Sequence, residues 1–119
     1  MKCPLVPISI GELLDKITIL QIKSEYTNNQ YVHKELQDLS KIAINLGVYE
    51  SKYLDDLLKV NRKLWDIEDK LRECERNFTF DDEFIRLARQ VYTTNDKRSR
   101  IKKDINEETN SEYSEVKLY

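Results

Sequence analysis

The chain has 119 residues, a formal net charge of -2, and only two glycines and two prolines. Its length predicts one domain over residues 1–119, and the shortage of helix breakers favours an all-α fold. The acidic balance argues against nucleic acid as a partner, and no segment is apolar and long enough to span a membrane.

The N-terminus and the two cysteines indicate the compartment. The first residues lack the long apolar run that is typical of a signal peptide. Cys3 and Cys74 have neither the spacing of metal ligands nor the neighbourhood of a catalytic thiol. We therefore expect reduced thiols, a cytoplasmic location, no metal site and no cofactor.

The first predicted helix covers residues 10–26. Ser9 and Glu12 form a capping box, in which each side chain accepts a hydrogen bond from the backbone amide of the other residue. Ile8 and Leu13 flank this cap and form a hydrophobic staple. Together these signals fix the start of the helix.

The remaining predicted helices cover residues 30–46, 50–76 and 80–107. Each has apolar residues at alternating steps of three and four, which is typical of one buried helix face. Gly47 is expected as the left-handed C-terminal cap of the second helix. Short turns make consecutive helices fold back, so the sequence predicts an antiparallel up-down bundle of four helices with short extended N- and C-terminal tails.

Two polar residues, Thr94 and Arg98, interrupt the apolar stripe of the last helix. A buried guanidinium costs several kcal/mol unless it is paired, so Arg98 needs a carboxylate, a bound anion or a water-filled cleft. In an up-down bundle, the positions of the turns decide which residues share a level along the bundle axis. This arithmetic places Asn61 level with Asn95, and Asp15 close to Arg98.

The polar residues at this level form a candidate site for a small anionic ligand. Arg98 offers a planar fork for a carboxylate or phosphate, and Trp65, one turn from Asn61, offers an aromatic wall. The alternative is a structural network in which Arg98 pairs with Asp15 and fixes the register of the helices. The predicted ligand-binding set is Asp15, Lys16, Asn61, Trp65, Asn95, Arg98 and Lys102.

A second candidate anion site lies at one end of the predicted bundle. Basic residues between Lys97 and Lys103 fold back beside the start of the first helix, where Gly11 leaves backbone amides bare. Two alternatives stay open, namely that the cations offset the helix dipole and that Gly11 permits close packing of another segment. We also expect residues 5–6 and 116–119 to lie against each other or against Gly11.

The first helix has a second apolar face, formed by Ile19, Ile22 and Tyr26. This face exceeds what a four-helix core requires. We therefore predict that it forms the seam of a homo-oligomer.

Several segments resemble one known family. They are residues 7–20, which read PISIGELLDKITIL, and residues 60–69, 84–89, 94–98 and 115–119. This family of short helical bacterial and phage proteins is catalogued only as a domain of unknown function. The resemblance implies a compact helical fold and no established activity, so no catalytic residue is carried over. Its members are often encoded near surface-polysaccharide genes.

Three functional classes follow from these observations, of which a nucleic-acid accessory protein depends only on the basic stretch of the last helix and is disfavoured by the acidic balance. The leading interpretation is a non-catalytic cytoplasmic helical module that binds a protein partner or a small anionic ligand. The alternative is a small all-helical enzyme, mutase-like or pyrophosphohydrolase-like, that acts on a phosphorylated or carboxylated metabolite. The sequence has no phosphate loop, dinucleotide fingerprint or serine elbow, so no motif selects a reaction.

Overall fold

The computed structural model describes all residues from 1 to 119 and contains four helices and no strand. The helices are α1 (Ile10–Tyr26), α2 (Gln30–Asn45), α3 (Ser51–Arg76) and α4 (Asp82–Glu108). The all-α prediction is confirmed, and each predicted helix boundary lies within two residues of the observed one. None of the four helices combines the length and the apolar composition that a bilayer crossing requires.

The predicted capping signals explain most of the helix ends. The Ser9 hydroxyl accepts a hydrogen bond from the Glu12 amide at 3.0 Å, and Gly47 adopts a left-handed φ of 73° directly after the end of α2. The second half of the predicted capping box is not formed. The Glu12 carboxylate instead pairs with Lys102 at 2.7 Å, because α4 crosses the start of α1.

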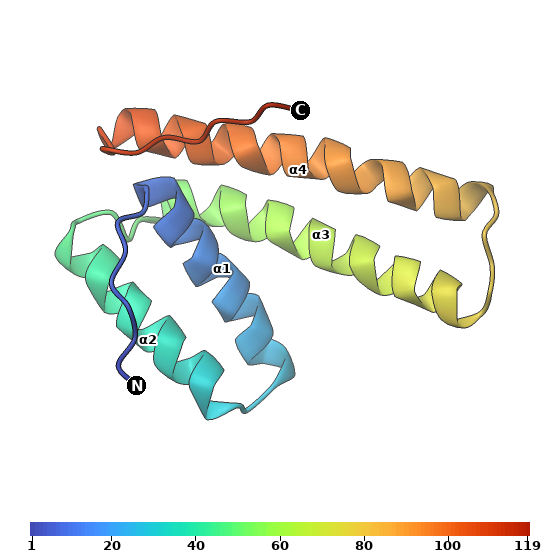
Figure 1. The fold of residues 1–119 in the computed structure, drawn as a ribbon, viewed down its shortest axis with the longest axis horizontal. Coiled ribbons are helices and arrows are strands. Elements are labelled where there is room, and N and C mark those ends of the chain that lie inside the picture. Colours follow the sequence, from blue (N-terminus) through green and yellow to red (C-terminus); the bar gives the residue numbers. More distant parts are fainter.

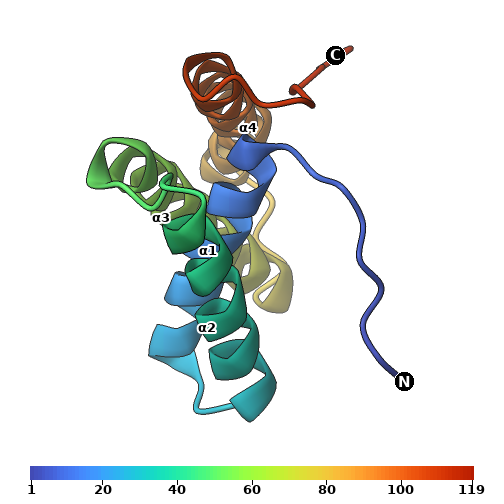
Figure 2. The same cartoon turned by 90° about the vertical axis from the view of Figure 1, so that its left-hand side faces the viewer.

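The four helices form two hairpins that meet at an angle (Figure 1). One hairpin is α1–α2 and the other is α3–α4, and α1 packs against all three other helices, whereas α2 packs against α1 alone. The predicted up-down arrangement of four neighbouring helices is therefore not confirmed. Figure 2 shows the same arrangement from the side, with the start of α1 directly below α4 and with α1 and α2 running downward from there.

The unusual apolarity of α1 explains this arrangement. Leu13, Leu14, Ile17, Leu20 and Ile22 are all buried, so α1 is covered on more than one side and forms the centre of the main core. The second apolar face of α1, which we predicted to be a dimer seam, is consequently used within one chain.

The three predicted seam residues differ in their exposure. Ile22 is buried inside the protomer, and Ile19 is half-buried. Tyr26 is exposed, but its ring stacks on Trp65 of α3 with a centroid distance of 5.1 Å. The three residues therefore do not form one continuous exposed face, and self-association through the exposed Tyr26 stays a prediction.

The two tails leave the core in different directions (Figures 1 and 2). The C-terminal segment returns along α4, whereas residues 1–8 extend away from it, and Leu5 and Leu118 are both exposed. The predicted contact between the two tails is therefore wrong. Only the polar residues that follow α4 reach the start of α1.

Candidate functional site

Asp15 of α1 is the centre of the polar cluster, and its side chain is fully buried. Its carboxylate accepts hydrogen bonds from Arg98 Nε at 3.0 and 3.1 Å, and from Arg98 Nη2. Asn61 Nδ2 of α3 donates to the same carboxylate at 2.8 Å. The structure thus brings together three helices at the level that the turn positions predicted.

A hydroxyl group that the sequence analysis missed completes this network. Asn61 Nδ2 also donates to Thr18 Oγ1 at 2.9 Å, and the Thr18 hydroxyl donates to the backbone oxygen of Asp15 at 2.8 Å. Thr18 follows Asp15 by three residues, so it shares a face of α1 with it. This spacing was the available signal. Because the Nδ2 group of Asn61 donates to both Asp15 and Thr18, this buried amide stabilises the crossing of α1 and α3.

Arg98 is held along one edge and exposed along the other. Asp15 occupies the Nε–Nη2 edge, and 28% of the Arg98 side chain remains exposed. Nη1 donates to Asn95 Oδ1 at 3.4 Å. The hydrogen bond to Asp15 raises the pKa of Arg98 and outweighs burial, which lowers it, so the guanidinium stays charged.

Lys102 is buried among three carboxylates. Its ammonium lies 2.7 Å from Glu12, 3.3 Å from Glu115 and 3.8 Å from Asp15. Burial by itself lowers the pKa of Lys102, but the hydrogen bond with Glu12 and the nearby negative charges exceed this effect and raise it overall. Lys102 is therefore a fixed cation that links α4, α1 and the C-terminal segment.

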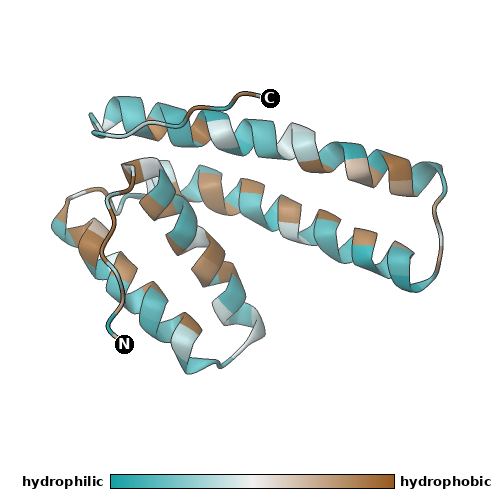
Figure 3. Ribbon diagram, in the orientation of Figure 1, coloured by the Kyte–Doolittle hydropathy of each residue, from teal (hydrophilic) through white to brown (hydrophobic).

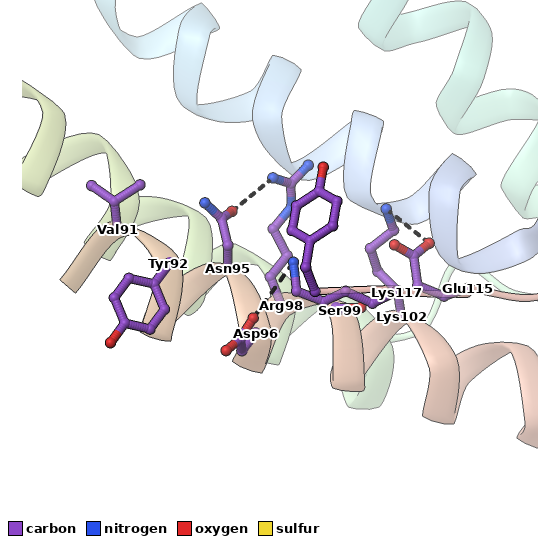
Figure 4. A pocket seen from close by; sticks show the side chains of 10 residues that line it. Val91, Tyr92, Asn95, Asp96, Arg98, Ser99, Lys102, Glu115 and Lys117 are labelled. Atoms are coloured by element: carbon purple, nitrogen blue, oxygen red, sulfur yellow. Dashed lines mark hydrogen bonds and ion pairs between the residues drawn. The ribbon is translucent and has the colours of Figure 1, made fainter. Parts of the chain in front are cut away.

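A cleft of about 570 Å³ lies between α4 and the C-terminal segment, next to these two cations. Figure 4 shows Asn95, Arg98 and Lys102 on one side of α4, with Glu115 and Lys117 of the C-terminal segment beside them. Lys117 also forms a surface ion pair with Asp96 at 3.5 Å. The remaining lining residues are Val91, Tyr92, Ser99 and Tyr119.

Four of the seven predicted site residues do not line the cleft: Asp15 and Asn61 are buried in the polar network, and Trp65 and Lys16 lie elsewhere. Trp65 does not line it, because its ring stacks on Tyr26 near the far end of α1. Lys16 is exposed and has no ion-pair or hydrogen-bond partner. The prediction of an aromatic wall from Trp65 is therefore wrong. The aromatic residues of the cleft are Tyr92 and Tyr119, and no pattern in the sequence indicates that the tail returns along α4.

The predicted second anion site at the start of α1 is also wrong. The Gly11 amide donates to Asn106 Oδ1 at 2.7 Å, and the Ile10 amide donates to Ser111 Oγ at 3.1 Å, so these amides already have protein partners. A Cβ atom on Gly11 would lie 2.7 Å from the backbone oxygen of Lys102. Close packing of α4, which was one of the alternatives, accounts for this glycine.

Comparison with known proteins identifies the family of the chain but no activity. No curated protein and no solved structure matches the chain. A family model matches residues 4–119, a range that includes all four helices and every residue of the polar cluster. On this match, the chain belongs to the family of unknown function DUF6165.

Proposed function

We propose that the protein is a non-catalytic module that binds a small carboxylate or phosphate monoester in the cleft between α4 and the C-terminal segment. The observation that carries this proposal is the state of Arg98. A fully buried carboxylate holds one edge of its guanidinium, and the partly exposed remainder lines a cleft of about 570 Å³. Such an arginine is positioned before a ligand arrives.

Prior positioning favours recognition of an anion. A guanidinium donates several hydrogen bonds in a fixed fork, and those that Asp15 does not use remain for a planar or tetrahedral anion. Because Asp15 already restrains the side chain, binding would cost little additional side-chain entropy. Arg98 would thus orient a bound anion as well as provide positive charge.

The neighbouring groups define how a ligand would fit. The ion pair between Lys117 and Asp96 is 3.5 Å long and partly exposed, so a stronger anion could replace Asp96 as the partner of Lys117 at small cost. The Asn95 side chain lies beside Arg98 and offers an amide. Lys102 adds positive potential, although its own hydrogen bonds are largely used.

The available acids support binding rather than catalysis. Asp15 and Glu12 are each paired with a cation, so neither carboxylate is free to contact a ligand. The single histidine, His33, is exposed on α2, which does not contact α4. The carboxylates that line the cleft, Asp96 and Glu115, are each paired with a lysine, at 3.5 and 3.3 Å, and no histidine lies beside them.

The test is a thermal-shift titration with inorganic phosphate and with succinate, at an ionic strength kept constant with sodium chloride. We expect the melting temperature of the wild-type protein to rise at millimolar phosphate or succinate. The rise should disappear in Arg98→Lys and shrink in Lys117→Met. Lys34→Met is the matched control, because Lys34 forms a surface pair with Asp38 on α2. An equal rise in all four proteins would refute the proposal.

A further inference from the structure

We infer that the distal part of the α3–α4 hairpin, residues 62–93, is a self-association surface on which α4 packs antiparallel against α4 of a second copy. Most of this part of the hairpin, called the arm below, extends beyond α1 and α2 (Figure 1), and only its first residues, Arg62 and Trp65, contact the end of α1. This surface meets the anion cleft only at Val91 and Tyr92, and the inference does not depend on anion binding.

The two helices of the arm bury few residues against each other and leave much of their surface exposed. Ile67 and Leu87 are the only buried residues between positions 62 and 93. The radius of gyration is 16.1 Å, whereas a compact domain of this length has about 13.5 Å. The exposed surface of 8676 Å² exceeds the value for a compact monomer of this mass by about 1,900 Å², to which the arm and the tails both contribute. A standard interface needs about 800 Å² from each partner.

The exposed side of the arm carries an apolar stripe. Ile85, Ala88 and Tyr92 follow one another at steps of three and four on α4, and all three are exposed, with Ile85 at 55% and Tyr92 at 56%. Phe78 and Phe80 extend the apolar surface around the turn, where Figure 3 shows hydrophobic positions at the end of the hairpin. A continuous stripe of this kind is typical of a helix that packs on a partner.

The backbone at the turn gives independent support. Phe78 has a left-handed φ of 51° and an 81% exposed side chain. The other two helices that end in this way use Gly47 and Asn110, the residue types that tolerate this conformation. A phenylalanine here costs about 1 kcal/mol and gains no packing within the chain. Local strain that presents an exposed aromatic ring indicates a contact outside the chain.

Charge complementarity indicates that the occupant is a second copy. Asp82 and Arg89 lie two helical turns apart beside the stripe, and neither has an ion-pair partner in the chain. Both line a shallow groove of about 440 Å³ that also contains Ile85. In an antiparallel pair with its twofold axis near residue 86, Asp82 of each copy faces Arg89 of the other. The same register places Ile85 of each copy beside Ile85 of the other, and Tyr92 at the level between Phe78 and Phe80 of the other, which is an isologous interface.

Measurement of the molar mass by sedimentation equilibrium, at micromolar to submillimolar concentrations, tests this surface. We expect the wild-type protein to form dimers and Ile85→Asp to sediment as a monomer of 14.2 kDa. Ile44→Asp is the matched control, because Ile44 is equally exposed on α2 and should leave the dimer intact. Circular dichroism establishes that each variant retains its helices.

A charge swap tests the register. Asp82→Arg and Arg89→Asp should each raise the dimer dissociation constant about tenfold or more, since each places two like-charged pairs in the interface. The double variant should recover the wild-type constant to within about threefold. A wild-type chain that is monomeric throughout, an Ile85→Asp variant that remains dimeric, or a double variant no better than the singles would overturn the inference. A heterologous protein that binds the arm of a strictly monomeric chain would also contradict it.

Discussion

Removing the Arg98 side chain should destabilise the fold, because it leaves a fully buried carboxylate without its main partner. In an Arg98→Met variant, Asp15 keeps the hydrogen bond from Asn61 at 2.8 Å and the ammonium of Lys102 at 3.8 Å. It loses all three hydrogen bonds from the guanidinium. Methionine retains most of the aliphatic volume, so the lost charge dominates the effect.

The expected loss is about 3 kcal/mol, at the lower end of the range for breaking a buried ion pair. The lower end applies because Lys102 still faces Asp15 and because Arg98 is itself partly exposed. A chain of this length has a total stability of about 6–18 kcal/mol, so the variant should fold. The melting temperature should fall by about 10–15 °C.

The assay is urea unfolding followed by helical circular dichroism and by the fluorescence of Trp65, the only tryptophan. Arg62→Met is a matched control. Arg62 forms a two-pronged pair with Glu25, at 2.6 and 2.7 Å, that also joins two helices, but both side chains are more than 40% exposed. We expect this control to leave the urea midpoint nearly unchanged. If Arg98→Met were no more destabilising than Arg62→Met, the assignment of a buried pair would be refuted.

Three further predictions concern Gly11, Lys102 and Phe78. Gly11→Ala should destabilise the protein by about 1–2 kcal/mol, because the new methyl group would lie 2.7 Å from the backbone oxygen of Lys102. This loss should exceed the gain from the better helix propensity of alanine. Thermal unfolding measures the change, and a stabilised variant would contradict the close packing of α4 on Gly11. Burial lowers the pKa of Lys102, but its carboxylate partners raise it overall, so its contribution to stability is complete below about pH 10.4, the unfolded value, and is lost as the pH rises through the folded pKa. Unfolding free energies measured from pH 9 to about pH 12 should therefore fall less steeply in Lys102→Met than in the wild-type protein, and equal slopes would rule out this contribution. Phe78→Gly should stabilise the isolated chain by about 1 kcal/mol, because glycine adopts the left-handed conformation without strain, and the same change should weaken dimers; urea unfolding of the monomer at low concentration decides the first point.

The agreement at Asp15 shows what could be derived from the sequence. The α3–α4 hairpin is formed as predicted, and Asp15 pairs with Arg98 as well, although its level was counted through α2, which does not contact α3 or α4. Asp15 and Arg98 were each polar within an apolar stripe, so a partner was required for both. Level and chemistry together were sufficient to identify the pair.

The wrong predictions concern the rotation of side chains around their helices and the direction in which segments run. The level of a residue along a helix axis determines neither. Trp65 lies one turn beyond Asn61, and its ring points toward Tyr26 rather than toward Arg98. Helix α2 was expected to complete a bundle, but the apolar faces of α1 alone cannot specify which helix covers each face. The path of residues 111–119 along α4 has no periodic signal, so Tyr119 and Lys117 were missed as lining residues.

The exposed edge of Arg98 is what distinguishes a binding site from a purely structural network. A well-packed apolar pair is often as stable as a buried ion pair, so register alone does not require Arg98 to face a cleft. An Asp15→Leu/Arg98→Met variant separates the two roles, because it removes both charges and leaves Asn61 bonded to Thr18 at 2.9 Å. We expect this variant to be more stable than Arg98→Met alone, with a coupling of about 2 kcal/mol, and to show no shift of its melting temperature with phosphate or succinate. If the double variant still responded to these anions as the wild-type protein does, the cleft beside Arg98 would not be where they bind.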